Sequence, residues 1–315
     1  MQASLYRPGQ SAAPPDVLVL SKRYDADSLD QAQALRARHG TRLVLDLCDN
    51  HFFSSTDAPA WQARAERLSI AARSVDLVVT STEALAEVVR REAGAELRTT
   101  VIGDAAEPPY TPSPLARWPR PMDEWRLAEL TRRLRPEQGC RLVWFGHHGI
   151  DYAEGGMLDL AKLRPRLELA STLQALSLTV ISNNRHKFDK LTRGWALPVH
   201  YLEWRPNTVS RALQMHQVAL IPINPNPYTR CKTNNRLATA LLHGLAVAAD
   251  SIPSYQDFAD DCALDDWEQG LQRLISEPVW RLSQVQSGVA RIEREWQLNH
   301  LAEQWRQTLT QLSAR

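Results

Sequence analysis

The chain has 315 residues and no apolar stretch long enough to cross a membrane. Met1–Asp16 also lacks the order of basic and then apolar residues that marks a secretory signal. These absences predict a cytoplasmic protein, for which peripheral contact with the inner face of a membrane stays open.

Cysteine is scarce, and its spacing excludes two classes of site. Four cysteines, Cys48, Cys140, Cys231 and Cys262, lie far apart and form no C-x-x-C pair. A disulfide framework and a cysteine-type zinc site are therefore not expected, and a reducing compartment fits.

Neither sign of charge is in large excess. There are 37 Lys and Arg residues against 36 Asp and Glu, which gives a formal net charge of +1. No strong field attracts a polyanion, so nucleic acid is not an expected partner.

Three motifs of common α/β enzymes are also missing. The chain has no G-x-S-x-G elbow, no G-x-G-x-x-G after its early strands and no Walker loop. This disfavours an α/β-hydrolase, an NAD-binding protein and a P-loop hydrolase.

What is present is an alternation of short apolar runs and helical patterns, which predicts parallel sheets buried on both faces. The predicted strands are Asp16–Leu20, Arg42–Leu47, Val75–Thr80 and Thr99–Ile102, then Arg141–Phe145, Leu178–Ser182, Val199–Leu202, Val218–Ile223 and Leu245–Ala249. The predicted helices are Ser28–His39, Ala58–Ala72, Thr82–Gly94, Asp123–Arg135, Met157–Ala175, Lys187–Gly194, Thr208–His216, Asn235–His243 and Ser254–Asp260.

Two such series separated by the proline-rich segment Glu107–Arg120 predict two doubly wound, Rossmann-like domains. We expect a reduced N-terminal domain at 1–120 and a second domain at 121–277. The remainder, 278–315, reads as helix, with Trp residues that are suited to packing between domains.

The segment Lys232–Val247 is the most informative, because a basic, amide-rich loop there becomes a helix. Lys232, Asn234, Asn235 and Arg236 lie at this junction, where unpaired N–H groups and the helix dipole favour an anion. A phosphate site is one interpretation, and an N-cap with solvated charges is the other.

In open α/β sheets, ligands bind beyond the carboxyl ends of the strands. The glycines and the polar or aromatic residues that follow strands of the second series are Gly146, His147, His148, Gly149, Asn183, Trp204 and Tyr228. They suit a nucleotide diphosphate, although the Gly-His-His-Gly run also fits a tight turn and Trp204 also fits packing. A metal site is not expected, because adjacent histidines point in different directions.

In the first series, Asp46, Asp49 and His51 lie at the end of a strand and are expected to face a cleft between the domains. A carboxylate or imidazole there is suited to act as general base on an acceptor hydroxyl. Capping of the next helix is the alternative role for Asp49.

Together these segments resemble the group-1, family-4-like glycosyltransferases of the GT-B fold. Ser74–Ala86 is similar to the family's "aDaVitvSealae" stretch, and Thr100–Asp104 to its "vIpNGvD". Leu142–Gly146 resembles the first strand of the donor domain, and Ala240–Val247 resembles "EAmAcGlPVv". The Trp and Leu residues of 296–309 resemble the final helices, which in this fold cross back to the N-terminal domain.

The resemblance implies a cytoplasmic, metal-independent transferase that needs no cofactor and uses a nucleotide sugar as co-substrate. The donor would bind the second domain, and a glycan or lipid-linked acceptor the first. The chain departs from the family at the E-x7-E pattern, where Cys231 and Thr239 occupy the two glutamate positions without gaps. Two alternatives therefore stay open: a nucleotide-sugar epimerase of the same fold, and a catalytically silent module that binds a nucleotide sugar or a partner.

Overall fold

The computed structural model describes residues 3–7, 13–110, 113, 121–135 and 139–314. The chain divides into two compact units. Unit 1 comprises Met1–Ala105, Asn226–Thr233 and Glu295–Arg315, and unit 2 comprises Ala106–Pro225 and Asn234–Arg294. One short loop of the second series, Asn226–Thr233, thus belongs to unit 1. Most of the proline-rich segment lies outside the described residues.

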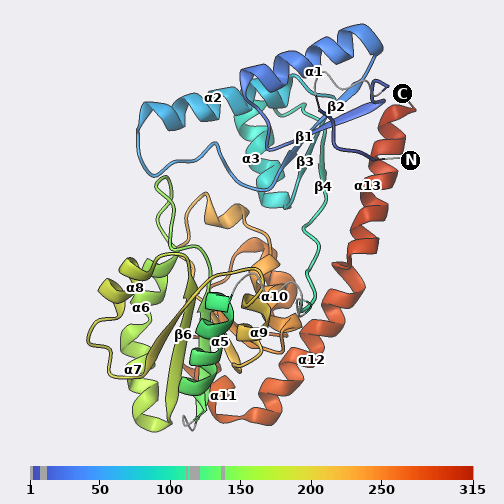
Figure 1. The fold of residues 1–315 in the computed structure, drawn as a ribbon. Coiled ribbons are helices and arrows are strands. Elements are labelled where there is room, and N and C mark those ends of the chain that lie inside the picture. The colour runs from blue at the N-terminus through green and yellow to red at the C-terminus, as the bar shows by residue number, and fades with distance from the viewer. Residues whose placement is uncertain (1–2, 8–12, 111–112, 114–120, 136–138, 315) are drawn as a thin grey trace. The chain divides into compact units, whose positions relative to one another are not determined.

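Unit 1 contains a parallel sheet in which the strands follow chain order, β1-β2-β3-β4 (Figure 1). These strands are Val17–Ser21, Arg42–Leu47, Leu77–Thr80 and Thr99–Val101. The connecting helices are α1 (Ala26–His39), α2 (Pro59–Arg73) and α3 (Glu83–Ala93). Because the strand order does not reverse, all three helices contribute to one core cluster on one face of the sheet.

The C-terminal helix α13 (Leu298–Ser313) covers the other face of this sheet. Leu301, Trp305, Leu309 and Leu312 recur at helical spacing and pack against strand residues such as Val44 and Val79. The prediction that the C-terminal end returns to the N-terminal domain is thereby confirmed.

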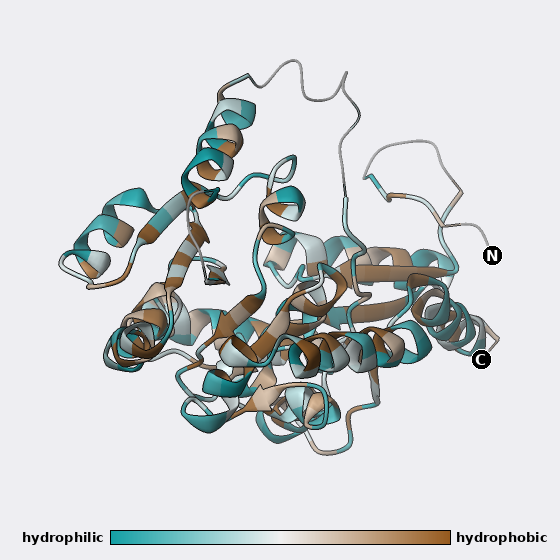
Figure 2. Ribbon diagram, turned by 90° about the horizontal axis from the view of Figure 1, so that it is seen from below, coloured by the Kyte–Doolittle hydropathy of each residue, from teal (hydrophilic) through white to brown (hydrophobic). Residues whose placement is uncertain are grey.

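Unit 2 contains a six-stranded parallel sheet in the order β10-β9-β8-β5-β6-β7. Its strands are β5 (Cys140–Phe145), β6 (Leu176–Ser182), β7 (Val199–Glu203), β8 (Val218–Ile221), β9 (Ala246–Ala249) and β10 (Ala263–Leu264). Every residue of β6, β8 and β9 is buried, which explains their nearly continuous apolar sequences. The strands stand out as hydrophobic in Figure 2.

Helices enclose the sheet of unit 2. They are α5 (Pro121–Leu134), α6 (Met157–Lys162), α7 (Arg164–Leu173), α8 (Arg185–Thr192), α9 (Val209–Leu213), α10 (Asn235–Leu242), α11 (Gln269–Ser276) and α12 (Pro278–Glu295). A Cβ placed on Gly288 of α12 would lie 2.6 Å from Leu241 Cδ1, so glycine permits close packing against α10.

Three predicted elements differ from the structure. The single helix predicted over Met157–Ala175 is two helices, because Pro165 starts a new helix at its first turn. Ser254–Asp260 is the 3-10 helix η2 (Pro253–Phe258) rather than an α-helix. The two-residue strand β10 was not predicted, because it is too short to show a period.

Candidate functional site

In the sheet of unit 2, the order in which strands are added reverses between β5 and β8. These strands are neighbours although two other strands lie between them in sequence. A ligand crevice is expected outside the carboxyl ends of the two strands at such a switch point. The sequence places Gly146–Gly149 directly after β5, and α10 follows β8. Unit 1 has no such reversal, so the rule points to unit 2.

Arg236, in the first turn of α10, lies against the backbone of Gly146. A Cβ built on Gly146 would be 3.2 Å from Arg236 Nη2, so a larger residue would press on the guanidinium. The Arg236 Cζ atom also lies 6.0 Å from the centre of the buried Trp144 ring. The structure thus brings together two residues predicted separately for the donor site, a glycine of the β5 loop and the arginine of α10.

The rest of the β5 loop is held by residues that follow β6. Asn183 Oδ1 accepts from the backbone N–H of His148 at 3.2 Å and lies 2.8 Å from its Nδ1. Lys187 Nζ donates to the carbonyl oxygen of His148 at 2.8 Å and would lie 3.1 Å from a Cβ on Gly149. His148 and Asn183, both predicted for the site, are therefore neighbours, and Lys187 contacts the same loop although the sequence analysis did not name it as a candidate.

The rings of the two histidines of this loop are neighbours, with centroids 4.4 Å apart and planes tilted by 32°. Burial and the adjacent His148 lower the pKa of His147. A neutral imidazole still donates one hydrogen bond.

The other residues predicted on unit 2 occupy varied positions. Asn234 precedes α10 and is buried, and its carbonyl oxygen accepts from Ala238 N at 2.9 Å. Asn235 Oδ1 accepts a hydrogen bond from Thr239 Oγ1 at 3.1 Å, so its side-chain oxygen is bonded to a residue of the same helix. Trp204 follows β7 with 44% of its surface exposed, which leaves its ring accessible to a ligand.

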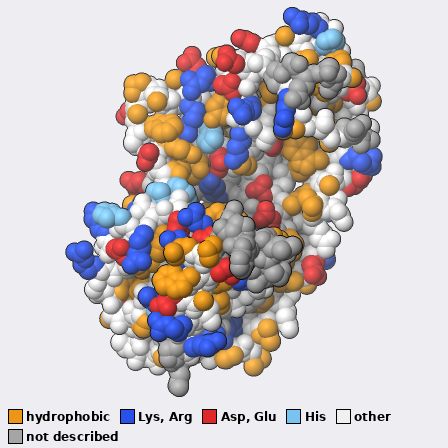
Figure 3. Space-filling view, viewed as in Figure 1, with side chains coloured by type: hydrophobic (Ala, Val, Ile, Leu, Met, Phe, Trp, Pro, Cys, Tyr) orange, Lys and Arg blue, Asp and Glu red, His pale blue; other side chains and the backbone are white. Residues whose placement is uncertain are grey.

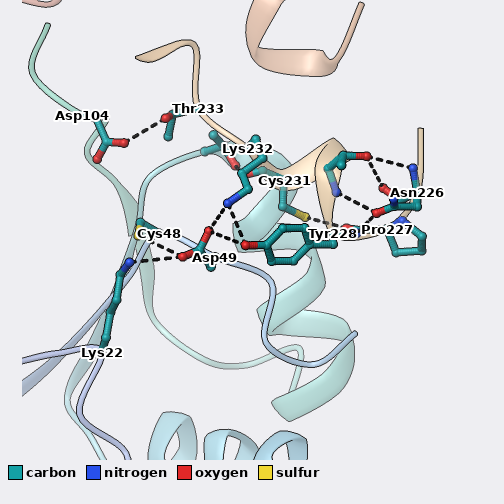
Figure 4. A network of polar contacts seen from close by, with 12 residues as sticks. Lys22, Cys48, Asp49, Asp104, Asn226, Pro227, Tyr228, Cys231, Lys232 and Thr233 are labelled. Carbon is teal, nitrogen blue, oxygen red and sulfur yellow. Dashed lines mark hydrogen bonds and ion pairs between the residues drawn. The ribbon is translucent and has the colours of Figure 1, made fainter. Parts of the chain in front are cut away.

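Lys232 and Tyr228 lie in unit 1, where both contact Asp49 (Figure 4). Lys232 Nζ is 2.5 Å from Asp49 Oδ1 and 2.8 Å from Tyr228 Oη. Lys22 Nζ binds the other carboxylate oxygen at 3.1 Å. Asp49 thus forms ion pairs with two ammonium groups. The basic segment Lys232–Arg236 is divided between the two units, with Lys232 in unit 1 and Arg236 in unit 2.

The segment 226–233 is fixed to unit 1 at several points. Asn50 Nδ2 donates to the Pro227 carbonyl oxygen at 2.9 Å, and Thr82 Oγ1 donates to that of Cys231 at 3.0 Å. Thr233 Oγ1 donates to Asp104 Oδ2 at 2.8 Å. The Cys231 side chain is 2% exposed and belongs to the core of unit 1, so it is not available to a ligand.

The predicted acidic and basic groups of unit 1 have different electrostatic surroundings. Burial disfavours the ionised form of Asp49, but the Lys232 and Lys22 ammonium groups outweigh it and hold the Asp49 pKa far below its usual range. Burial and the Arg64 guanidinium lower the pKa of His51 to about 4. Asp46 shows the opposite direction, because burial and the negative charge of Asp104 raise its pKa.

These directions distinguish the two carboxylates as bases. A general base works best when its pKa lies near the working pH. The pKa of Asp49 is shifted away from that range, whereas the pKa of Asp46 is shifted toward it. Asp46 accepts a hydrogen bond from Ser21 Oγ at 2.8 Å and lies at the carboxyl end of β2.

Within the described ranges, no three His, Cys, Asp or Glu side chains are grouped closely enough to hold a metal ion. Among the same residues, no helix combines the length and hydrophobicity that a membrane span requires. Figure 3 shows acidic and basic side chains mixed over one face, in keeping with the net charge of +1.

No family model matches the chain. No curated protein sequence matches it either. Solved structures do. Sucrose-phosphate synthase from Thermosynechococcus elongatus is 14% identical with a TM-score of 0.67, over 95% of this chain and 74% of that one. HepE from Anabaena, in complex with UDP and glucose, is 16% identical with a TM-score of 0.65, over 94% and 77%. An E. coli protein described as trehalose-6-phosphate, bound with UDP-2-fluoro glucose, is 14% identical with a TM-score of 0.62, over 96% and 74%.

The similarity extends over nearly the whole chain, and at these identities it establishes the fold. The chain has the GT-B architecture of two Rossmann-like units that the sequence resemblance implied.

Proposed function

We propose that the chain is a glycosyltransferase that moves a sugar from a nucleotide sugar to an acceptor hydroxyl. The observation that carries the proposal is the position of Arg236 against the Gly146 backbone at the switch point of unit 2. A glycine backbone beside an arginine and a helix N-terminus suits a diphosphate. Two solved structures of this fold contain UDP or a UDP-sugar, which supports a nucleotide sugar as the ligand.

In this proposal the residues of unit 2 stabilise the leaving group. When the bond between sugar and diphosphate breaks, negative charge develops on the diphosphate oxygens. Arg236 and Lys187 lie beside the loop that would hold them, and fixed cations in such a place lower the barrier to transfer. We therefore propose a metal-independent reaction without a bound cofactor, in which EDTA leaves the rate unchanged.

Unit 1 would receive the acceptor, a glycan or a lipid-linked sugar, in the cytoplasm. Of the two aspartates predicted for this role, Asp46 is the better candidate for the base that removes the hydroxyl proton, because its pKa is raised while that of Asp49 is lowered. Asp49 instead orients Lys232 and Lys22 through its two ion pairs.

A silent nucleotide-sugar-binding module is the second candidate. The burial of Cys231 favours it, because the first position of the family's glutamate pair has no access to a ligand. An epimerase of the same fold is the remaining alternative, and no contact in the structure favours it.

One assay separates these functions. The protein is incubated with UDP-glucose, GDP-mannose and other nucleotide sugars, each alone and with a panel of saccharide acceptors. Release of nucleoside diphosphate together with a lengthened acceptor supports the transferase, and its loss in Arg236→Ala but not in Arg193→Ala supports the site. An isomerised donor in the absence of acceptor indicates an epimerase. Tight donor binding without turnover over the panel indicates the silent module.

A further inference from the structure

We infer that unit 2 has a second binding site, for a neutral saccharide, in a cavity that is lined by other residues than the proposed donor site. The cavity has a volume of about 360 Å³, within the range of small-molecule sites. It opens where β8, β9 and β10 end, beside α6 and the start of α7. Its charged and aromatic lining residues are Asp159, Lys162, Arg166, Asp250, Asp265 and Trp267.

Asp159 is the first observation that indicates a ligand. Its side chain is 6% exposed, yet its one recorded partner among the described residues is the exposed Lys162, at 3.3 Å from Oδ1. A buried carboxylate is costly unless hydrogen bonds satisfy it. No described residue donates to the second oxygen, Oδ2, which lies beside Gly155, 3.0 Å from a Cβ built on that glycine. A hydroxyl group in the cavity would supply such a donor.

On the other side of the cavity, hydrogen bonds within the protein already fix the lining side chains. Asp250 accepts from the Ile223 N–H at 2.7 Å and from Trp267 Nε1 at 2.5 Å, which fixes the indole beside the cavity. Asp265 adopts a left-handed backbone with φ of 55°, and its Oδ1 accepts from the Ser251 N–H at 2.8 Å. Such a conformation is uncommon outside glycine, and it places a carboxylate at the rim of the cavity.

The lining chemistry selects the class of ligand. Three carboxylates face two cations, so a phosphate or another anion would meet net negative charge. An apolar molecule would leave these polar groups unsatisfied. A neutral molecule with several hydroxyls can donate to Asp159 and Asp265 and accept from Arg166, while the Trp267 ring offers an apolar face.

The cavity differs from the donor crevice in every residue used above. Gly146–Gly149, Lys187 and Arg236 do not line it. The inference therefore does not depend on the proposed transferase activity. In a protein that lengthens a glycan, such a site would hold part of the saccharide chain remote from the reacting hydroxyl.

The test is saturation-transfer NMR and calorimetry with glucose, maltose and sucrose on the full chain. The variants are Asp159→Asn, which keeps the shape of the side chain, and Arg166→Ala at an exposed position. Arg193→Ala, which removes an exposed arginine elsewhere on unit 2, is the matched control. Each titration is repeated in the Arg236→Ala background.

We expect at least one of the three sugars to bind, and Asp159→Asn to weaken it about tenfold, the usual value of a hydrogen bond to a charged group. Arg166→Ala should also weaken binding, whereas Arg193→Ala and Arg236→Ala should not. Failure of all three sugars to bind overturns the inference. It is also overturned if folded Asp159→Asn and Arg166→Ala proteins both bind the sugar with the affinity of the natural protein. Loss of sugar binding in Arg236→Ala would place the sugar in the donor crevice and also overturn it. Failure of the natural protein to bind any nucleoside diphosphate, with sugar binding intact, would count against the proposed function and leave this site standing.

Discussion

Asp46 and Asp49 are three residues apart in sequence, yet their surroundings give them opposite properties. Asp46 ends β2 with a serine hydroxyl as partner and a second carboxylate, Asp104, nearby. Asp49 lies between two lysines, one of which comes from 183 residues further along the chain. The sequence identified both as candidate bases, but it could not rank them, because the Lys232 contact is long-range.

The ranking gives a prediction for a matched pair of variants. Asp46→Asn should lower kcat for sugar transfer by about a hundredfold or more, the usual contribution of a general base. Asp49→Asn should lower kcat by less than about tenfold, because it removes partly exposed ion pairs rather than the base. Steady-state kinetics on both proteins measure the difference. Equal losses, or a larger loss in Asp49→Asn, would show that Asp49 acts on the acceptor directly.

Asp49 also makes a prediction about stability and pH. Its pKa is below the usual 3.8 in the folded chain, so its contribution is present above pH 3.8 and is lost as the pH falls through the lowered value. Asp49→Asn should therefore destabilise the protein by about 1 kcal/mol at pH 7. The difference from the natural protein should shrink below pH 3.8 in chemical denaturation. A constant difference down to acid pH would argue against the ion pairs.

His216 is buried in unit 2, with Nε2 2.7 Å from Thr179 Oγ1. Burial lowers its pKa from 6.5 to about 4, so between these values the unfolded chain binds the extra proton. Stability should be full above pH 6.5 and fall toward pH 4, by on the order of 3 kcal/mol from this group. In His216→Gln the slope of melting temperature against pH should flatten, whereas in the exposed His186→Gln it should persist. An unchanged slope in His216→Gln would refute the assignment.

At the scale of elements, the buried parallel strands were the most predictable features. β2 was predicted over Arg42–Leu47, where it lies, because both faces of the sheet are covered and its sequence is nearly all apolar. The packing of the loop 226–233 on unit 1 was not predictable. It depends on contacts of Asn50 and Thr82 with residues 149 or more positions away, which leave no local pattern.

Lys187 shows a second limit of sequence analysis. It was predicted to start a helix over Lys187–Gly194, which the structure places two residues earlier, at Arg185–Thr192. Its role follows from the hydrogen bond to the His148 carbonyl oxygen, which needs the β5 and β6 loops to be neighbours. Given the strand order, the first turn of the helix after β6 would have been a reasonable place to search for a cation.

The β5 loop is tightly packed against Gly156, which yields a prediction at this scale. Gly156 has φ of 74°, and a Cβ there would lie 2.7 Å from Gly149 N. Gly194 has φ of 73° with only the Arg164 side chain at 4.0 Å. Gly156→Ala should displace the loop and weaken UDP binding at least tenfold, while Gly194→Ala should cost only about 1 kcal/mol of stability. Similar UDP affinity in the two variants, measured by calorimetry, would contradict a role for the loop.

At the scale of the whole molecule, the architecture was predicted from the order of weak motifs, and the structural comparisons confirm it at 14–16% identity. The reason is that local hydrophobic patterns indicate the alternating strands and helices, and these patterns are retained when individual residues change. The activity is not fixed in this way, because it depends on a few side chains in the loops. Cys231 and Thr239, which the ungapped comparison with the family motif puts at the two glutamate positions, illustrate the difference.

The central claim is that the crevice of unit 2 binds a nucleoside diphosphate through Arg236 and Lys187. The most direct measurement is calorimetric titration of UDP, GDP, dTDP and CMP into the natural protein and into Arg236→Ala, Lys187→Ala and the control Arg193→Ala. We predict that at least one of these nucleotides binds, and that its affinity falls about tenfold or more in the first two variants and is unchanged in the control. The account would be contradicted if none of the four binds, or if Arg236→Ala and Lys187→Ala bind as well as Arg193→Ala.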